Sequence, residues 1–512
     1  MESMKNEKLL EKALGLLPTL YENKVPAQRA VEFTKENGKI NETSVGNYGE
    51  RTLGKGDSLT LDFGDHYVGY LSLDLKSIGS HPDAPALLRI RFAERPVELF
   101  EDASEYHGWI SPSWIQEELV HVDVLPTLYS MERRYSFRYV RIDVVDISSK
   151  YSLKISDAFC RAVSSADDTA LLPYSTDNKA DQRIDAISVK TLHDCMQTVF
   201  EDGPKRDRRL WMGDLRIQAL ANYETYRAND MVKANLYLFG ALTQEDGRVG
   251  ACLFLDPVPE VDDTCMFDYS LFFVDALYDY YEATGDRETV SDLWQVCKRQ
   301  IELSKENLNE RNIVRDSDRL GWCFVDWNLE LNKQASAQGI FLYTLERAIQ
   351  LAACIGDVLA EEEYAELYLK LKEAANAFLL DQGTGLYRSG SDGQISAASQ
   401  IWMILGGAVE GAKAAKLLEK LEGTPDALKM VTPYMYHHYI EALIKTGRKE
   451  KALEIMRAYW GGMADHGADT FWELYNPENP DESPYGGTIV NSYCHAWSCG
   501  PAYFLRKYYN RG

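Results

Sequence analysis

The sequence predicts a β-sandwich over about residues 45–170 followed by an (α/α)6 barrel over residues 171–512, with a helical or extended segment, residues 1–44, ahead of them. Apolar residues recur at every second position in the first part and at helical spacing in the second, which is the primary sequence signal for strands and helices. In addition, short glycine-containing turns join successive helices. Such turns connect antiparallel neighbours, as the hairpins of a helical barrel require.

The predicted sandwich depends on alternating apolar residues between about residues 45 and 165. Turns that carry Gly, Pro or Asp separate the alternating runs, so several short strands are expected. One apolar and one polar face is typical of antiparallel sheets that bury a single face. The apolar positions of these runs are Leu59, Leu61 and Phe63; Leu71, Leu73 and Leu75; Leu88, Ile90 and Phe92; Tyr135, Phe137 and Tyr139; and Val140, Ile142 and Val144.

The apolar period becomes that of helices after about residue 175. Gly285, Gly356 and Gly447 each offer the left-handed conformation that ends one helix before the next begins. Six hairpins of this kind can close into a toroidal barrel; an open solenoid is the alternative, although the hairpins share no strict repeat. Twelve helices are predicted, near residues 180–198, 214–228, 230–243, 268–284, 289–308, 334–354, 359–380, 394–405, 408–421, 432–446, 448–462 and 490–507.

Three long connections, residues 244–267, 309–333 and 463–489, are rich in aromatic residues and aspartate. Long loops in compact domains are usually functional. We expect these three connections to gather at one rim of the barrel, where a pocket can form.

The charge balance limits the classes of partner. The 55 basic and 79 acidic side chains give a net charge of -24, and no basic tract interrupts this excess. Nucleic acid and anionic membrane surfaces are therefore not expected as partners. Residues 1–14 carry charges where a signal peptide would need an apolar core, and no run reaches the ~18 consecutive apolar residues of a membrane helix.

The nine cysteines match neither a disulfide framework nor CxxC metal spacing. Reduced thiols in a cytoplasmic protein are the simplest interpretation, and a secreted form made without its leader is the alternative. The chain has no phosphate loop, nucleophile elbow or HExxH motif, and the adjacent His437 and His438 would point to different sides of a helix. We therefore expect neither a cofactor nor a metal; a homo-oligomer is compatible with the sequence but not predicted by it.

The strongest functional signal is residues 201–214, Glu-Asp-Gly-Pro-Lys-Arg-Asp-Arg-Arg-Leu-Trp-Met-Gly-Asp. This segment combines acids, guanidinium groups and a tryptophan with glycine and proline, which prevent a regular helix or strand. Such a set suits a sugar-cleaving pocket, because glycoside hydrolysis needs one protonated and one ionised carboxyl group. A solvated loop whose acids cap the next helix explains the same residues equally well.

The segment resembles the signature of the bacterial α-L-rhamnosidases of glycoside hydrolase family 78, approximately D-x-P-x-R-[E/D]-R-x-x-W-x-G-D. Residues 470–473, Thr-Phe-Trp-Glu, resemble the family's T-x-W-E, and residues 492–497, Ser-Tyr-Cys-His-Ala-Trp, resemble its S-x-x-H-x-W/F. Three matches in the family's order are fairly specific. The resemblance implies the (α/α)6 fold and an inverting hydrolase that removes terminal α-L-rhamnose, or a related deoxysugar, from glycosides or oligosaccharides.

On this resemblance, Asp202 binds sugar hydroxyl groups, Asp207 is the general acid and Asp214 is a further binding carboxylate. The sequence departs from the commonest pattern at Asp207, where the family often has glutamate. Aspartate is one methylene shorter, so its carboxyl group must lie closer to the glycosidic oxygen or act through a water molecule.

The resemblance also places Arg206 in the pocket, whereas a buried ion pair with Asp202 or Asp214 is the structural alternative. A neighbouring guanidinium group lowers the pKa of a carboxyl group, so desolvation would have to keep Asp207 protonated. Trp211 has polar neighbours in the sequence. This favours packing against a sugar face over filling a core.

Glu473 is the predicted general base because it matches the glutamate of T-x-W-E; Trp472, beside it, is assigned to substrate binding. A base roughly 6.5–9.5 Å from the acid leaves room for the attacking water and gives inversion. A salt bridge at the rim is the alternative for Glu473. The family has a substrate-binding histidine at the position of His495, although a lone histidine is more often a satisfied core group.

Residues 324–327, Phe-Val-Asp-Trp, resemble an Asp-Trp pair in a loop of the family. We therefore expect Asp326 to bind a hydroxyl group and Trp327 to stack on the sugar. Asp262 and Asp263 are further candidates for pocket acids through their location in the 244–267 connection, and we include Asp263 among the substrate-binding residues.

Two alternative functions remain. Barrels of this fold also carry other glycosidases, sugar phosphorylases and polysaccharide lyases, but the acid-rich loops disfavour binding of phosphate or uronates. A catalytically silent carbohydrate-binding homologue is the second alternative, and the presence of both Asp207 and Glu473 favours the enzyme. We expect the β-sandwich to act mainly as structural support, with carbohydrate binding as the lesser alternative.

Overall fold

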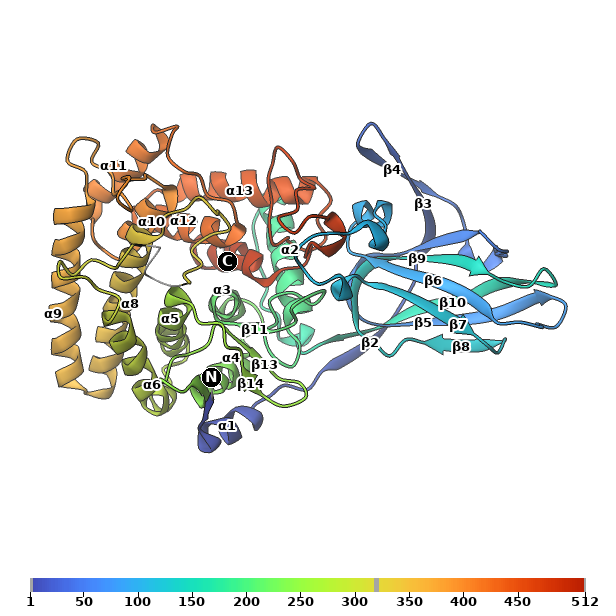
Figure 1. The fold of residues 1–512 in the computed structure, drawn as a ribbon, viewed down its shortest axis with the longest axis horizontal. Helices are drawn as coiled ribbons and strands as arrows, with labels where there is room; N and C mark the ends of the chain where they lie inside the picture. The colour runs from blue at the N-terminus through green and yellow to red at the C-terminus, as the bar shows by residue number, and fades with distance from the viewer. Residues whose placement is uncertain (1–2, 317–321, 511–512) are drawn as a thin grey trace.

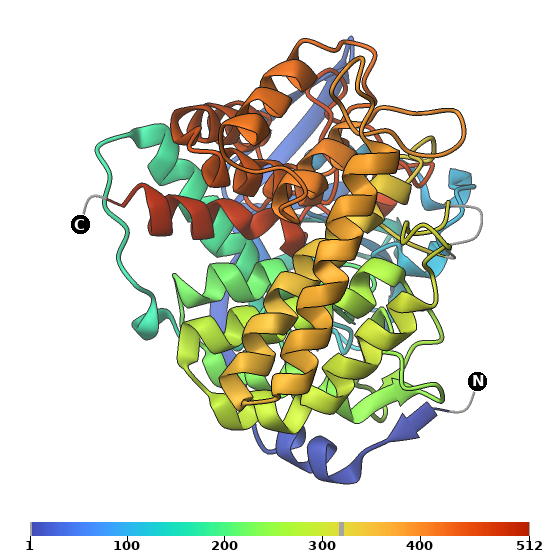
Figure 2. The same cartoon turned by 90° about the vertical axis from the view of Figure 1, so that its left-hand side faces the viewer.

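The computed structural model describes residues 3–316 and 322–510. A β-domain lies beside a larger helical domain (Figure 1), and Figure 2 turns the helical domain toward the viewer, with strands visible behind it. The predicted order, a β-sandwich followed by a helical barrel, is confirmed. Within the described residues, no helix has both the length and the apolar content that a membrane span requires.

The first residues of the chain pack on the helical domain. Strand β1 (Ser3–Lys5) pairs with β12 (Leu242–Gln244), and helix α1 (Glu7–Leu14) packs on α4 (Asn229–Ala241). Leu9 and Leu10 of α1 are buried in the core of that domain. The next three strands join the β-domain. The alternation in the sequence predicted that this domain starts at about residue 45, but its sheet begins earlier in the chain, with these strands.

The β-domain is built around one long strand, β5. Its first half pairs with β3 and β9 and its second half with β8 and β10, with a shift of register between Asp62 and Tyr67. Every apolar position predicted from the alternation is buried, which accounts for the strand pattern. The strands are β2 (Tyr21–Pro26), β3 (Arg29–Glu36), β4 (Lys39–Ser44), β5 (Ser58–Gly79), β6 (Ala86–Ala93), β7 (Glu117–Val122), β8 (Thr127–Ser130), β9 (Tyr135–Asp146) and β10 (Tyr151–Ser164).

Twelve helices follow β10 in the part of the chain that the structure describes. Gly285, Gly356 and Gly447 have φ values of 71°, 79° and 78°, so the predicted left-handed helix ends are confirmed. The helices are α2 (Lys179–Cys195), α3 (Met212–Tyr223), α4, α5 (Phe267–Thr284), α6 (Arg287–Lys305), α8 (Gln334–Ile355), α9 (Val358–Ala374), α10 (Ala397–Leu405), α11 (Gly411–Glu422), α12 (Pro433–Lys445), α13 (Lys449–Asp465) and α14 (Gly500–Tyr508).

The inner helices form a closed ring. Helices α3, α5, α8, α10 and α12 pack on one another in that order, and α14, with the short 3₁₀ helix that precedes it, packs between α12 and α3. The partners α4, α6, α9, α11 and α13 each follow an inner helix along the chain. Helix α2 packs on α14 and α13 and so takes the sixth outer position. Three short strands form a small separate sheet: β11 (Leu210–Trp211), β13 (Cys252–Phe254) and β14 (Glu260–Val261). In the sequence, β11 precedes α3, and β13 and β14 precede α5.

The last predicted helix, residues 490–507, is shorter in the structure. Helix α14 begins only at Gly500, after the 3₁₀ helix Ala496–Cys499. The residues ahead of it form hydrogen bonds with other segments instead: His495 N–H donates to Phe471 O at 2.9 Å and Ala496 N–H donates to Asp202 O at 2.7 Å. These two bonds join the three segments that carry the predicted site.

Candidate active site

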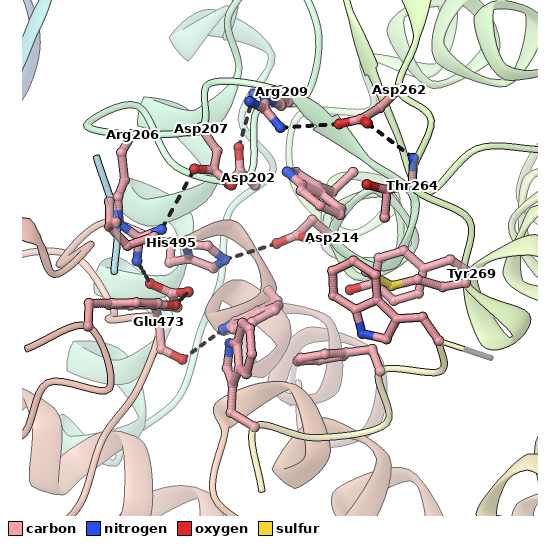
Figure 3. Close-up of a pocket in the computed structure, with 18 of the residues that line it drawn as sticks. Asp202, Arg206, Asp207, Arg209, Asp214, Asp262, Thr264, Tyr269, Glu473 and His495 are labelled. Carbon is pink, nitrogen blue, oxygen red and sulfur yellow. Dashed lines mark hydrogen bonds and ion pairs between the residues drawn. The ribbon is translucent and has the colours of Figure 1, made fainter. Parts of the chain in front are cut away.

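A cavity of about 260 Å³ opens where α3, α5 and the 3₁₀ helix Ala496–Cys499 begin. Figure 3 shows the carboxyl groups of Asp202, Asp207, Asp214 and Glu473 around one space. The residues that line the cavity are Trp109, Ile110, Asp202, Arg206, Asp207, Arg209, Trp211, Asp214, Asp262, Thr264, Met266, Tyr269, Trp322, Phe324, Trp327, Glu473, Tyr485, His495 and Trp497.

The loop between α2 and β11 presents the first group of site residues. Asp202 and Arg209 close the loop, because Asp202 N–H donates to Arg209 O and Arg209 N–H donates to Asp202 Oδ1, both at 3.0 Å. Between them, Asp207 and Arg208 have φ values of 61° and 52°. Residues other than glycine rarely adopt this conformation, and such strain clusters at functional sites. The loop therefore holds Asp207 at the cavity by a specific, costly turn.

The same loop faces two ways. Asp202, Arg206 and Asp207 lie at the cavity, whereas Glu201, Lys205 and Arg208 bind the β-domain. Lys205 forms a buried ion pair with Glu98 of the β-domain. Glu201 pairs with Arg134 at 2.7 Å, and Arg208 donates to the carbonyl oxygen of Arg134 at 2.8 Å. Docking of the two domains thus fixes the position of the cavity-facing side chains.

Arg206 links the two predicted catalytic carboxylates. One guanidinium nitrogen donates to Glu473 Oε2, and the other lies 3.8 Å from Asp207 Oδ1. Nε donates to the carbonyl oxygen of Val490 at 2.7 Å. Arg206 is therefore a cavity residue as predicted, and its ion-pair partner is Glu473 and not Asp202 or Asp214.

Glu473 is buried and held from several sides. Its Oε2 accepts the bond from Arg206, and its Oε1 accepts a hydrogen bond from the hydroxyl group of Tyr485. Its backbone is fixed as well, since Glu473 N–H donates to Ser492 O at 3.1 Å and Trp497 Nε1 donates to Glu473 O at 3.0 Å. Both carboxyl oxygens and the backbone of Glu473 are therefore held in place at the cavity.

Asp202 and Asp214 are buried at the cavity, and the pKa of each carboxyl group is raised. Burial raises the pKa of Asp202 well above its usual value, and the neighbouring carboxyl groups of Asp207 and Asp214 raise it further. Burial also raises the pKa of Asp214, although His495, whose Nε2 lies 3.3 Å from Asp214 Oδ1, acts in the opposite direction. The cavity therefore offers both hydrogen-bond donors and acceptors to the hydroxyl groups of a sugar.

Of the residues predicted for the site, eight line the cavity: Asp202, Arg206, Asp207, Trp211, Asp214, Trp327, Glu473 and His495. Asp326 does not. It accepts hydrogen bonds from Val431 N–H at 2.8 Å and from the backbone and hydroxyl groups of Thr432 at 3.0 and 2.6 Å. Its oxygens are thus engaged at the start of α12, which leaves them unsuited to binding a sugar hydroxyl group.

Trp472 and Asp263 also lie away from the cavity lining. Trp472 is 1% exposed, with the guanidinium group of Arg95 over its ring at 4.1 Å, so it packs at the junction of the two domains. Asp263 is exposed, whereas its neighbour Asp262 lines the cavity and lies 3.3 Å from Arg209. Both acids were candidates from the sequence, and the structure brings only Asp262 to the cavity.

Several cavity residues carried no signal in the sequence. Trp109 and Ile110 come from a loop of the β-domain, and Tyr485 comes from the 463–489 connection. The aromatic content of that connection predicted a role for the segment but not for an individual residue. For Trp109, only the docking of the two domains reveals its place beside the cavity.

One group among the described residues has the spacing of metal ligands: His66, Asp194 and Cys494, which are buried between the domains. Both ring nitrogens of His66 already have partners, Asp194 at 2.6 Å and Glu94 at 3.1 Å. Lys190 also bonds Asp194, at 2.5 Å. The ammonium group of Lys190 binds Asp194, and a carboxylate lies on each side of His66. This cluster is therefore an ion-pair network that joins the domains.

Comparisons with known families match both domains. A model described as glycosyl hydrolase family 78 alpha-rhamnosidase N-terminal domain matches residues 27–162. A second, described as bacterial alpha-L-rhamnosidase 6 hairpin glycosidase domain, matches residues 172–509. A search of curated proteins gives no match.

Among solved structures, the chain is similar to a rhamnosidase from Klebsiella oxytoca with rhamnose bound. The two chains are 44% identical with a TM-score of 0.97, over 99% of this chain and 100% of that chain. A family 78 rhamnosidase of Bacillus sp. GL1 is 22% identical with a TM-score of 0.76, over 88% of this chain and 46% of that chain. A Streptomyces avermitilis alpha-L-rhamnosidase complexed with L-rhamnose is 17% identical with a TM-score of 0.66, over 96% and 44%. These last two similarities concern the fold.

Proposed function

The chain belongs to the α-L-rhamnosidases of glycoside hydrolase family 78, and we propose that it removes terminal α-L-rhamnose from glycosides or oligosaccharides with inversion at the anomeric carbon. One observation carries the proposal most directly: Asp207 and Glu473 lie in one cavity, joined through the guanidinium group of Arg206. A pair of carboxyl groups on either side of the bound sugar is what glycoside hydrolysis requires.

In the proposed mechanism, Asp207 protonates the departing glycosidic oxygen while Glu473 takes a proton from the attacking water. The environment supports this division of roles. Glu473 pairs with Arg206 through one oxygen and accepts a hydrogen bond from Tyr485 through the other, so its carboxyl group has a fixed orientation at the cavity. Asp207 lies farther from the guanidinium group, at 3.8 Å, and beside the carboxyl group of Asp202.

The remaining cavity residues account for sugar binding in this proposal. Asp202, Asp214 and His495 offer polar groups to the cavity, and Trp211 and Trp327 contribute indole rings to its lining. Aromatic walls with a few convergent polar groups are typical of carbohydrate pockets.

Two measurements test the proposed function. Hydrolysis of 4-nitrophenyl α-L-rhamnoside should exceed that of the matching β-D-glucoside, α-D-mannoside and α-L-fucoside. Proton NMR at early times should show rhamnose of inverted anomeric configuration before mutarotation mixes the anomers. Turnover of a different glycoside would change the sugar assignment, no turnover of any would favour the silent homologue, and a retained product would contradict Glu473 as the base.

We also propose a reducing, cytoplasmic location for the chain. All nine cysteines are free thiols in the structure, and seven of them are buried. Cys195 and Cys494 remain thiols although their sulfur atoms lie only 3.8 Å apart. Thiol counting by alkylation and mass spectrometry of the chain isolated from its native cells tests this proposal: nine modified cysteines are expected.

A further inference from the structure

Tyr485 contacts both members of the Arg206–Glu473 ion pair. Its hydroxyl group donates to Glu473 Oε1, while the guanidinium carbon of Arg206 lies 4.2 Å from the centre of its ring. Tyr485 is 2% exposed, so solvent does not compete for these contacts. One tyrosine therefore fixes the second oxygen of Glu473 and also supports the group that binds the first.

The backbone of Tyr485 is bound by the β-domain. A β-domain strap, residues 101–114, runs along the segment that carries Tyr485. The hydroxyl group of Tyr106 donates to Tyr485 O at 2.9 Å, and Trp109 Nε1 donates to Pro484 O at 3.0 Å. Glu101 accepts hydrogen bonds from Thr488 N–H at 2.9 Å and from the Thr488 hydroxyl group at 2.6 Å.

The strap and the Tyr485 segment also approach unusually closely. A Cβ atom at Gly108 would lie 1.8 Å from Tyr485 O, so only glycine allows this approach. Around it, Tyr485 packs with Ile115 of the β-domain and with Ile489 and Val490 in one apolar cluster. The hydrogen bonds, the close approach at Gly108 and the apolar cluster together fix the position of Tyr485 relative to the cavity.

From this geometry we infer that Tyr485 is a positioning residue for the general base Glu473, and that the β-domain strap holds Tyr485 in the place where it can act. The β-domain then contributes to catalysis by orienting the base, in addition to supporting the fold. This inference builds on the proposed function, in which Glu473 activates water.

The substitution Tyr485→Phe tests the inference because it removes the hydroxyl group and keeps the ring. We expect kcat for 4-nitrophenyl α-L-rhamnoside to fall about 10-fold or more, since hydrogen bonds to charged groups are stronger than neutral ones. KM should change by less than about 2-fold. The acidic limb of the kcat/KM profile should move to higher pH, because an ionised carboxylate that loses a donor is protonated more readily.

Other charged or titratable groups near Glu473 can also contribute to the pH profile. Arg206, Asp207, Asp214 and His495 also lie at the cavity and are unchanged in the variant. A double variant isolates the pathway: if Tyr485 acts through Glu473, Tyr485→Phe should have little further effect on the residual activity of Glu473→Gln. An equal loss on both backgrounds would overturn the inference.

Tyr493→Phe is the matched control. Tyr493 is also buried in this region, and its hydroxyl group accepts from Asn491 Nδ2 at 3.2 Å without contact to a catalytic carboxylate. Its kcat and pH profile should match the wild type. Tyr106→Phe, which removes the bond from the strap to Tyr485 O, should reproduce the effect of Tyr485→Phe in weaker form.

The outcomes separate this inference from the proposed function. Failure of the wild type to hydrolyse any α-L-rhamnoside would contradict the proposed function itself. An active wild type with an unchanged pH profile and kcat in Tyr485→Phe would contradict only the positioning role. A fall in activity that merely follows a fall in melting temperature, with no movement of the acidic limb, would assign Tyr485 a structural role.

Discussion

Arg206 donates a hydrogen bond to Glu473, and both side chains are buried beside the cavity. Glu473→Gln removes the charge of the proposed base and keeps its shape. We expect kcat to fall about 10²–10⁴-fold, the usual contribution of general acid–base catalysis. The melting temperature should also fall, because Arg206 loses its main counter-charge. Steady-state kinetics and thermal unfolding measure both effects.

Glu478→Gln provides the control for this substitution. Glu478 belongs to the same connection but is exposed and away from the cavity. Its activity and melting temperature should remain at wild-type values. Wild-type kcat in Glu473→Gln would exclude Glu473 as the base.

Asp207→Asn removes the proposed acid. Protonation matters most when the departing oxygen is basic, so we expect a large loss of kcat/KM on alkyl rhamnosides and a small loss on 2,4-dinitrophenyl rhamnoside. The ratio of the two losses, obtained from steady-state kinetics, is the measured quantity. Equal losses on both substrates would transfer the acid role to another carboxyl group of the cavity, such as Asp202, whose pKa is raised by burial.

Trp211 and Trp472 should respond differently to truncation. Trp211 is half-buried at the cavity, so Trp211→Ala should raise KM and lower the melting temperature only slightly. Trp472 is buried under Arg95, so Trp472→Ala should cost ~3–5 kcal/mol of stability. Steady-state kinetics measure KM and thermal unfolding measures stability for both variants, which distinguishes a binding role from a structural one. A large stability loss in Trp211→Ala with unchanged KM would make its ring structural.

Asp326→Asn tests a residue that the sequence predicted for sugar binding and that the structure places at the start of helix α12. The substitution replaces one carboxyl oxygen, an acceptor, with an NH2 group, a donor, which then faces backbone N–H donors. We therefore expect a loss of about 1–3 kcal/mol in stability and no change in KM. Urea unfolding and steady-state kinetics measure these effects. A raised KM at unchanged stability would restore Asp326 to the binding site.

The loss in Asp326→Asn should also depend on pH. Burial raises the pKa of Asp326 from 3.8 to about 6. A raised carboxyl pKa contributes stability that is fully present below the unfolded value and is lost as pH rises through the folded value. The difference in free energy of unfolding between wild type and variant should therefore be larger at pH 5 than at pH 7, on the order of 1 kcal/mol. A difference that grows toward pH 7 would contradict the raised pKa.

Local pattern was sufficient to predict the fold and to select eight residues that the structure brings to one cavity. Apolar periodicity located the strands and helices because burial of one face imposes it, as at Leu59 and Leu61. Asp202, Asp207 and Glu473 could be predicted to lie at the cavity because each belongs to a motif of a few adjacent residues. Asp326 and Trp472 were misplaced since an acid or indole in a motif can equally cap a helix or fill a junction. Trp109 belongs to the cavity only through domain docking, which no local pattern encodes.

The alternation of contacts along residues 201–208 has a consequence for how the protein unfolds. Lys205 and Glu98 form a buried ion pair across the domain boundary, one position away from Arg206. Separating the domains would leave these charges without partners, at a cost of several kcal/mol. The loop that carries Asp207 would lose its anchors at the same moment. The two domains should consequently melt in a single cooperative transition, and catalytic competence should vanish with it and not before.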